Sequence, residues 1–141
     1  MTQQTKFLLD TNVVSQLIKS SAEPGVLEWI DAQDEDDLLM SVVSIFEIRC
    51  GIDRLKPSKK RDLLEHWLTM EIMPRFAGRF VAVDEQMADL AGKMVGAKHL
   101  EGHQAGASDA LIAATAKVLG LRLATLDRGD FKRLGVELVE F

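Results

Sequence analysis

The hydrophobic pattern of the chain alternates between short apolar runs and amphipathic stretches. Short apolar runs bounded by polar or turn-forming residues are typical of buried strands, whereas apolar residues three and four positions apart indicate helices. The runs predict strands at residues 6–10, 38–43, 80–83, 121–126 and 136–141. Because parallel neighbours need helical crossovers, the alternation predicts an α/β fold of three α/β/α layers around a mostly parallel sheet of about five strands.

Capping and breaking residues set the expected ends of the helices. Ser44 is predicted to open the helix after the second strand, and Asp84 is predicted to cap the helix after the third. Ser108 is predicted to start a helix that is apolar nearly all round, as expected of a buried element. The full pattern predicts helices over residues 11–19, from Pro24 to the acidic stretch 34–37, over 44–55, between Pro57 and Pro74, from Asp84 to Gly102, and over 109–119.

Length and composition predict one compact domain over residues 1–141. The 141 residues are 47% hydrophobic and 28% charged, which is ordinary for a globular domain with one core. Apolar runs of four or five residues fall far short of the ~20 needed to cross a bilayer, so no membrane span is expected. The first residues lack the pattern of a secretion signal, and the single cysteine, Cys50, cannot form an internal disulfide. These features predict a cytoplasmic protein.

Four acidic residues are predicted to meet at one edge of the sheet. Asp10 and Asp127 each follow an apolar strand, so both are expected at the carboxyl edge, where open α/β sheets hold their ligands. Glu47 and Asp109 lie in the first turns of helices that begin at the same edge. The formal net charge of −5 gives no overall attraction to nucleic acid. Carboxylates that hold divalent cations would nevertheless present positive charge to a phosphate.

Each of these acids also has a purely structural interpretation. Glu47 could close a capping box with Ser44, and Asp109 could complement the dipole of its helix. Asp10 and Asp127 could cap the segments that follow them. Four acids at one edge would repel one another, however, and a hard divalent cation such as Mg²⁺, which takes oxygen ligands, removes that repulsion. The set therefore favours metal-dependent hydrolysis of phosphodiester bonds.

Four segments carry a specific resemblance to a known family. They read KFLLDTNVVS, SVVSIFEIRCGIDRL, ASDALIAATAKVLGL and TLDRGDF. In this order and at these separations they resemble the signature segments of the PIN-domain family, most closely those of its VapC and FitB-like toxins. The resemblance spans nearly the whole chain. It implies a PIN-like fold and an endoribonuclease that hydrolyses RNA through water activated by Mg²⁺, with Mn²⁺ as a substitute.

The resemblance also implies roles for individual residues. Asn12 and Thr125 match positions that orient the ligands by hydrogen bonding. The usual last segment of the family reads T-R-N-x-x-D-F, so either Asp127 or Asp130 could supply the fourth acid here. We expect Asp127, because it is closer to the end of the strand. The implied catalytic set is Asp10, Glu47, Asp109 and Asp127, with Asp10 and Asp109 as the metal ligands.

Partners follow from the same resemblance. It implies an antitoxin similar to VapB, contact with DNA only through that antitoxin, and a homodimer. Arg49 and Arg128 are the basic residues expected to contact RNA, because they neighbour Glu47 and Asp127. The identity of the cleaved RNA is not predicted, because the shape of the RNA governs such recognition.

Other functions stay open at this point. Asp10 could form an aspartyl-phosphate, as in haloacid-dehalogenase-like proteins, although these have a second aspartate where Asn12 stands. A non-catalytic PIN-like module could act only in complex with a DNA-binding partner. His99 and His103 flank Glu101 and could suggest zinc, but no HExxH arrangement and no cysteine pair accompany them.

Overall fold

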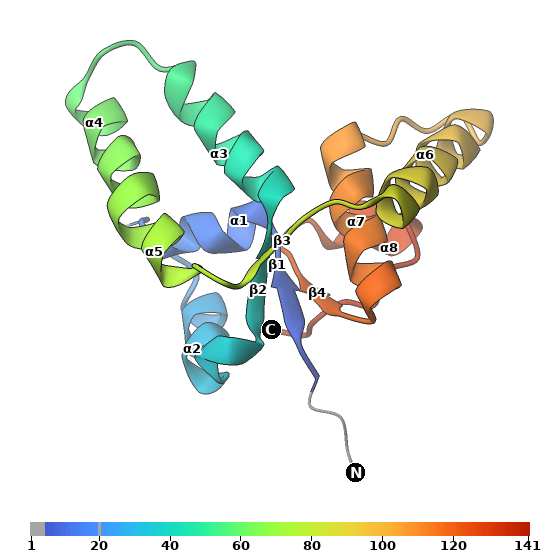
Figure 1. Ribbon diagram of the computed structural model, residues 1–141, viewed down its shortest axis with the longest axis horizontal. Coiled ribbons are helices and arrows are strands. Elements are labelled where there is room, and N and C mark those ends of the chain that lie inside the picture. Colours follow the sequence, from blue (N-terminus) through green and yellow to red (C-terminus); the bar gives the residue numbers. More distant parts are fainter. Residues whose placement is uncertain (1–4, 20) are drawn as a thin grey trace.

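A parallel sheet of four strands forms the centre of the protein (Figure 1). The computed structural model describes residues 5–19 and 21–141. The strands lie in the order β3-β2-β1-β4. Their bounds are Phe7–Leu9 for β1, Leu38–Ser41 for β2, Phe80–Val81 for β3 and Arg122–Ala124 for β4. The predicted α/β class with a parallel sheet is confirmed.

Helices cover both faces of this sheet. The α-helices are α1 (Thr11–Val14), α2 (Pro24–Ala32), α3 (Val42–Asp53), α4 (Lys59–His66), α5 (Met73–Arg75), α6 (Glu85–Leu100), α7 (Ala107–Leu119) and α8 (Arg128–Arg133). Two 3₁₀ turns, η1 (Ser15–Leu17) and η2 (Glu35–Asp37), and a π-helical stretch, η3 (Trp67–Ile72), complete the described elements. In Figure 1, α3 and α4 rise on one side of the sheet, and α6 and α7 lie on the other.

Alternate residues of the strands point to two separate cores. Phe7 and Leu9 of β1 pack into a cluster that includes side chains of α1, α2, α3 and η3. Leu8 of β1 and Leu123 of β4 pack instead against α7 and α8. Because successive side chains of a strand point to opposite faces, one short strand can anchor both helical layers. This explains why three apolar residues suffice for β1.

The strand order reverses beside β1. The chain passes from β1 to β2 and then outward to β3, and it returns to the other side of β1 as β4. In open α/β sheets, ligands bind outside the carboxyl ends of the strands at such a reversal. Asp10 follows β1, and its backbone N–H donates a 2.9 Å hydrogen bond to the carbonyl of Ala124. The topology therefore places Asp10 and Thr125 next to each other at this edge.

The start of α3 differs from the prediction. The strand was expected to continue to Val43, and Ser44 was expected to open the helix. Both expectations are wrong, because Ser41 is the N-cap and its hydroxyl oxygen accepts a 3.0 Å hydrogen bond from the N–H of Val43. The β-branched Val42 and Val43 favour strand locally, but the cap acceptor at Ser41 begins the helix earlier.

Further differences affect the other element ends. The helix expected from Ser108 begins at Ala107 with Gly106 as N-cap, so Ser108 is not the cap. The helix expected over residues 11–19 is a short α-helix followed by the 3₁₀ turn η1. The predicted third strand is confined to Phe80–Val81. The expected fifth strand is only an isolated parallel bridge between Leu123 and Leu138, within the described residues.

Other predicted ends are confirmed. Asp84 caps α6, because its Oδ1 accepts a 2.9 Å hydrogen bond from the N–H of Met87. Gly120 ends α7 in the left-handed conformation, at φ 65°, which glycine adopts without strain. None of the helices in the described parts of the chain combines the length and the apolar character needed to cross a bilayer.

Candidate active site

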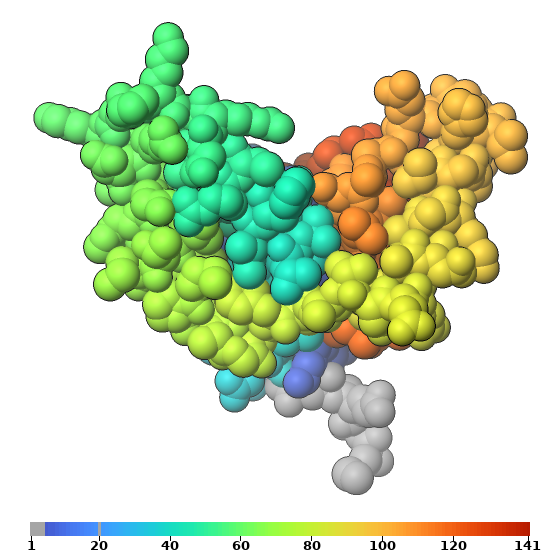
Figure 2. Space-filling view, turned by 45° about the horizontal axis from the view of Figure 1, so that its top comes forward, coloured from blue at the N-terminus to red at the C-terminus, as the bar shows by residue number. Residues whose placement is uncertain are grey.

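One open cavity at the carboxyl edge of the sheet contains all four predicted acids. We call it the acidic cavity; its volume is about 430 Å³. Figure 2 shows the surface hollowed between the parts formed by α3 and by α7. The structure thus brings together acids that are far apart in the sequence. The lining residues are Asp10, Thr11, Asn12, Ser15, Lys19, Glu47, Asp109 and Asp127.

Asp10 is the most enclosed of the four acids, with 4% of its surface exposed. Its Oδ1 accepts a 2.8 Å hydrogen bond from the N–H of Thr11, so Asp10 does cap α1. Its Oδ2 accepts a 2.8 Å hydrogen bond from the hydroxyl of Thr125. Burial raises the pKa of Asp10 to about 6; the two hydrogen bonds oppose this rise, and the charges of Asp109 and Glu47 add to it. The capping role and a place in the acidic cavity therefore coexist.

The contacts behind Asp10 come from Thr125 and Asn12. Besides donating to Asp10, the Thr125 hydroxyl oxygen accepts from the N–H of Asp127 at 3.0 Å and from Nδ2 of Asn12 at 3.4 Å. A hydroxyl has one proton and two acceptor positions, so this arrangement uses all of them. Oδ1 of Asn12 accepts a 3.1 Å hydrogen bond from the N–H of Leu126. The end of β4 is thereby tied to α1.

A hydrogen bond from Thr11 holds the side chain of Glu47. The Thr11 hydroxyl donates a 2.8 Å hydrogen bond to Oε1 of Glu47, and its oxygen lies 2.9 Å from Oγ of Ser44. Ser44 is buried within α3 and is not its N-cap. The interpretation of Glu47 as half of a capping box with Ser44 is therefore wrong. The side chain of Glu47 is directed instead by the residue next to Asp10.

Asp109 lies in the first turn of α7 and is half-buried. Burial raises its pKa, and the nearby charges of Glu47, Asp127 and Asp130 raise it further. Its position suits the helix dipole, as the structural interpretation proposed. The electrostatic effect of the neighbouring acids is unfavourable, however. Asp109 is therefore a carboxylate whose ionised form a nearby cation would stabilise.

Asp127 and Asp130 occupy different positions around this cavity. Asp127 is exposed, and slight burial, the charge of Asp130 and a hydrogen bond with Asp130 raise its pKa. Asp127 lines the acidic cavity. Asp130 lines a smaller neighbouring cavity of about 100 Å³ and pairs with Arg133 at 3.4 Å. This geometry favours Asp127 as the fourth acid of the acidic cavity.

The donor set of the acidic cavity fits a hard divalent cation. Within residues 5–19 and 21–141, no three acidic, histidine or cysteine side chains are gathered closely enough to hold an ion between them. Mg²⁺ commonly uses one or two carboxylates and keeps several waters, so it needs no such group of three. The side chains that line the acidic cavity offer carboxylate or hydroxyl oxygens as possible metal ligands. The exceptions are the amide of Asn12 and the ammonium of Lys19. Burial raises the pKa values of Asp10 and Asp109, the neighbouring acids raise them further, and a cation bound there would offset both effects.

The two arginines expected to contact RNA are engaged within the protein. Arg49 pairs with Asp53 at 3.3 Å and with Glu65 of α4. Arg128 donates to the carbonyl of Val139 and pairs with Glu140 at 3.1 Å. Their contact with RNA stays a prediction.

Three lining residues, Thr11, Ser15 and Lys19, were not singled out from the sequence. Thr11 carries the hydroxyl that holds Glu47, and its place directly after Asp10 was the available signal. Lys19 lines the acidic cavity itself, at the end of the segment that was predicted to be one helix. The unexpected 3₁₀ turn η1 sets where this lysine lies.

Comparisons with a family model, with known sequences and with solved structures all indicate the same family. The PIN domain model matches residues 7–137. Toxin FitB of Neisseria gonorrhoeae is 36% identical over 124 residues, covering 88% of this chain and 89% of that protein. VapC ribonuclease Y4jK of Sinorhizobium fredii is 33% identical over 132 residues, or 94% of each. The crystal structure of FitAcB from Neisseria gonorrhoeae matches with a TM-score of 0.83 at 34% identity, covering 95% of this chain and 96% of that chain. This protein therefore belongs to the PIN-domain family and is similar to its FitB and VapC toxins.

Proposed function

We propose that this protein is a metal-dependent endoribonuclease that hydrolyses RNA phosphodiester bonds. One observation carries the proposal: four carboxylates from separate segments line one open cavity at the reversal of the strand order. The name of a relative, VapC ribonuclease Y4jK, supports the same reaction. As an RNA-cleaving protein, it would act in the cytoplasm.

The residues of the acidic cavity would share the work of hydrolysis. Asp10 and Asp109 would hold the cation, and their raised pKa values would fall toward normal as they do so. Bound Mg²⁺ or Mn²⁺ would supply Lewis-acid stabilisation of the phosphate and a lower pKa for the attacking water. Glu47, oriented by Thr11, would position that water and accept its proton. Asp127, at the exposed rim, would complete the negative cluster and exchange protons with solvent.

We further propose that the protein is a toxin controlled by an antitoxin. The relative FitB is named a toxin, and a solved structure at 32% identity and a TM-score of 0.83 is described as FitAB bound to a DNA fragment. By analogy, this protein would contact DNA only through its antitoxin, and it would form a homodimer.

An open groove beside the acidic cavity supports such a partner. This groove has a volume of about 600 Å³, runs between η1, α3 and α4, and also includes Thr11 and Glu47 in its lining. Leu63 in its wall is 60% exposed, and Leu64 and Trp67 add apolar surface. A partner segment with apolar side chains would bury this surface and cover Glu47, which would block RNA.

Cleavage of a single-stranded RNA oligonucleotide by the purified protein tests the proposal. We expect cleavage with Mg²⁺ or Mn²⁺, none in excess chelator, and a loss of at least about 100-fold in Asp10→Asn. Asp89→Asn is the matched control, because Asp89 is an exposed residue of α6 paired only with Lys93 among the described contacts. Equal cleavage in chelator would contradict the mechanism. Soluble protein that neither cleaves RNA nor arrests growth on expression would favour the non-catalytic binding module.

A further inference from the structure

Lys19 lies where the acidic cavity meets the open groove between η1, α3 and α4. It is a lining residue of both. The preceding turn is fixed by the N–H of Ile18, which donates to the carbonyl of Ser15 at 3.3 Å, and by the Ser15 hydroxyl, which donates to the carbonyl of Thr11 at 2.9 Å. The segment that begins at Asp10 therefore also sets the position of this lysine relative to the acids.

The ammonium group of Lys19 forms no ion pair within the described part of the protein. Its side chain is exposed. By contrast, Arg49 and Arg128 are paired, and Lys98 pairs with Glu101 at 3.0 Å. Among the residues that line the acidic cavity, Lys19 is the one with a cationic side chain. It is thus an uncommitted ammonium group beside four carboxylates.

An RNA strand bound for cleavage would gain from a cationic contact at this position. If its scissile phosphate lay between Asp10 and Asp109, a flanking phosphate would lie near the mouth of the acidic cavity, where the other ionisable lining residues are acids. A lysine ammonium is a compact point charge on a flexible stem, suited to a phosphate and indifferent to the base. We propose that Lys19 binds an RNA backbone phosphate that flanks the scissile one. This inference rests on the proposed ribonuclease function and adds a substrate-binding residue to it.

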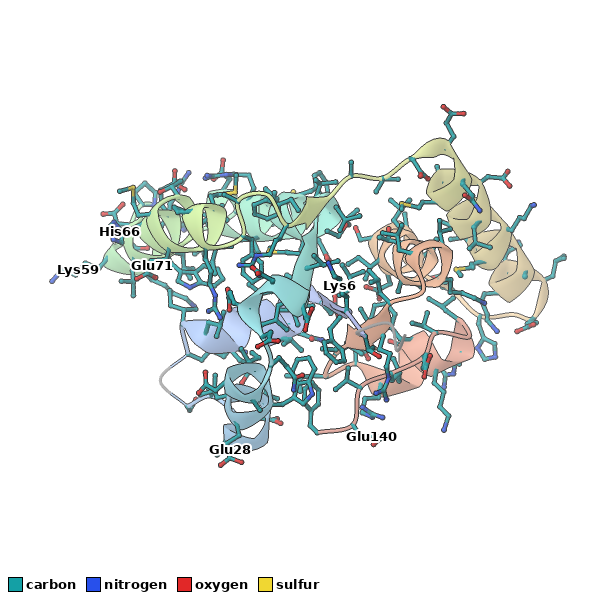
Figure 3. All side chains as sticks on the ribbon, turned by 60° about the horizontal axis from the view of Figure 1, so that its bottom comes forward. Lys6, Glu28, Lys59, His66, Glu71 and Glu140 are labelled. Atoms are coloured by element: carbon teal, nitrogen blue, oxygen red, sulfur yellow. The ribbon has the colours of Figure 1, made fainter. Side chains whose placement is uncertain are left out.

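The test compares Lys19→Gln with Lys59→Gln, because both variants lose one positive charge. Figure 3 shows Lys59 pointing away from the protein at the start of α4. Both changes are made in the Asp10→Asn protein, which should not cut RNA, and binding of a single-stranded RNA oligonucleotide is measured by fluorescence anisotropy at several salt concentrations.

We expect Lys19→Gln to weaken RNA binding about 5- to 10-fold at low salt. The logarithm of the RNA association constant falls as the logarithm of the salt concentration rises. The slope of this relation should become less negative by about 0.7, the value for one lost phosphate contact on a single strand. Lys19→Arg should restore both quantities, and Lys59→Gln should change neither slope nor affinity appreciably. In the protein with Asp10 intact, Lys19→Gln should raise KM and leave kcat nearly unchanged.

Three results would overturn the assignment. Affinity and slope in Lys19→Gln equal to those of Lys59→Gln would show that the lysine does not contact phosphate. Tighter RNA binding by Lys19→Gln would likewise contradict a contact between the ammonium and phosphate. A polyglutamate peptide that binds as tightly as RNA and equally depends on Lys19 would assign the lysine to an acidic protein partner. If the unaltered protein cleaves RNA with Mg²⁺, these results reject only the role of Lys19; absence of cleavage and of RNA binding rejects the ribonuclease function as well.

Discussion

The hydroxyl of Thr125 donates a 2.8 Å hydrogen bond to Oδ2 of Asp10, across 115 positions of sequence. The same hydroxyl oxygen accepts from the N–H of Asp127 and from the amide of Asn12. One side chain at the end of β4 thus contacts the most buried acid and the backbone of the most exposed one. Because β1 and β4 are adjacent parallel strands, the sheet itself fixes this contact.

Thr125→Val should impair catalysis while keeping the shape of the buried side chain. The hydrogen bond from Thr125 lowers the pKa of Asp10, so its loss should raise that pKa further above about 6. We expect kcat to fall about 10- to 100-fold, as for other residues that orient metal ligands. The acid limb of the pH–rate profile should move to higher pH. Thr125→Ser should preserve both properties, and an unmoved acid limb in Thr125→Val would contradict this role.

Thr11→Val should release Glu47 without disturbing the cap of α1. The cap uses the backbone N–H of Thr11, which valine retains, whereas the bond to Glu47 uses the hydroxyl. We expect single-turnover cleavage to slow about tenfold or more, with RNA affinity within about twofold of the original. Thr11→Ser serves as the control. A loss of RNA affinity with unchanged turnover would show that Thr11 acts in binding and not through Glu47.

The two acids near the start of α8 should differ in their effect on cleavage. Asp127 lines the acidic cavity, whereas Asp130 lines the neighbouring one and pairs with Arg133. Asp127→Ala should reduce Mg²⁺-dependent cleavage about 10- to 100-fold, and Asp130→Ala should reduce it less than about threefold. The opposite ranking, measured at saturating Mg²⁺, would assign the fourth position to Asp130.

The sequence predicted the order of the four strands along the chain and the sheet edge that the four acids share. Apolar runs followed by an acid are local signals, and the parallel arrangement follows from the helices between the strands. The start of α3 was mispredicted because Val42 and Val43 favour strand, while the cap that begins the helix comes from the less conspicuous Ser41.

Several contacts between distant elements were not predicted from the sequence. The Thr11 hydroxyl reaches Glu47 only because α1 packs beside α3, which the sequence pattern does not specify. The ion pair between Arg49 and Glu65 depends on the return of α4 alongside α3. The availability of Lys19 likewise depends on which acids the fold places near it, and not on its neighbours in sequence.

The metal-free protein should be less stable at neutral pH because of Asp10. Its pKa is about 6 in the folded protein against an ordinary value of 3.8. The folded state therefore binds more protons than the unfolded state between those values, and stability falls as the pH rises through about 4 to 6. The shift corresponds to on the order of 3 kcal/mol at pH 7.

Asp10→Asn tests this pH dependence because asparagine keeps an acceptor for the N–H of Thr11. Its amide nitrogen cannot accept from the Thr125 hydroxyl, so the two proteins are compared by how their stability changes with pH. In chelator, the free energy of unfolding measured with urea should rise by on the order of 3 kcal/mol more in the unaltered protein than in Asp10→Asn when the pH is lowered from 7 to below about 4. An equal change in both proteins would show that Asp10 carries no unfavourable charge.

Binding of Mn²⁺ to the metal-free protein tests the central claim most directly, because the acids are proposed to form a cation site before RNA arrives. Titration calorimetry on the unaltered protein, Asp10→Asn and the distant Asp89→Asn separates this site from general acidity. We predict saturable binding and a raised melting temperature with Mn²⁺ for the unaltered protein and for Asp89→Asn, and at least about tenfold weaker binding for Asp10→Asn. Equal Mn²⁺ affinity in Asp10→Asn and the unaltered protein would contradict the account.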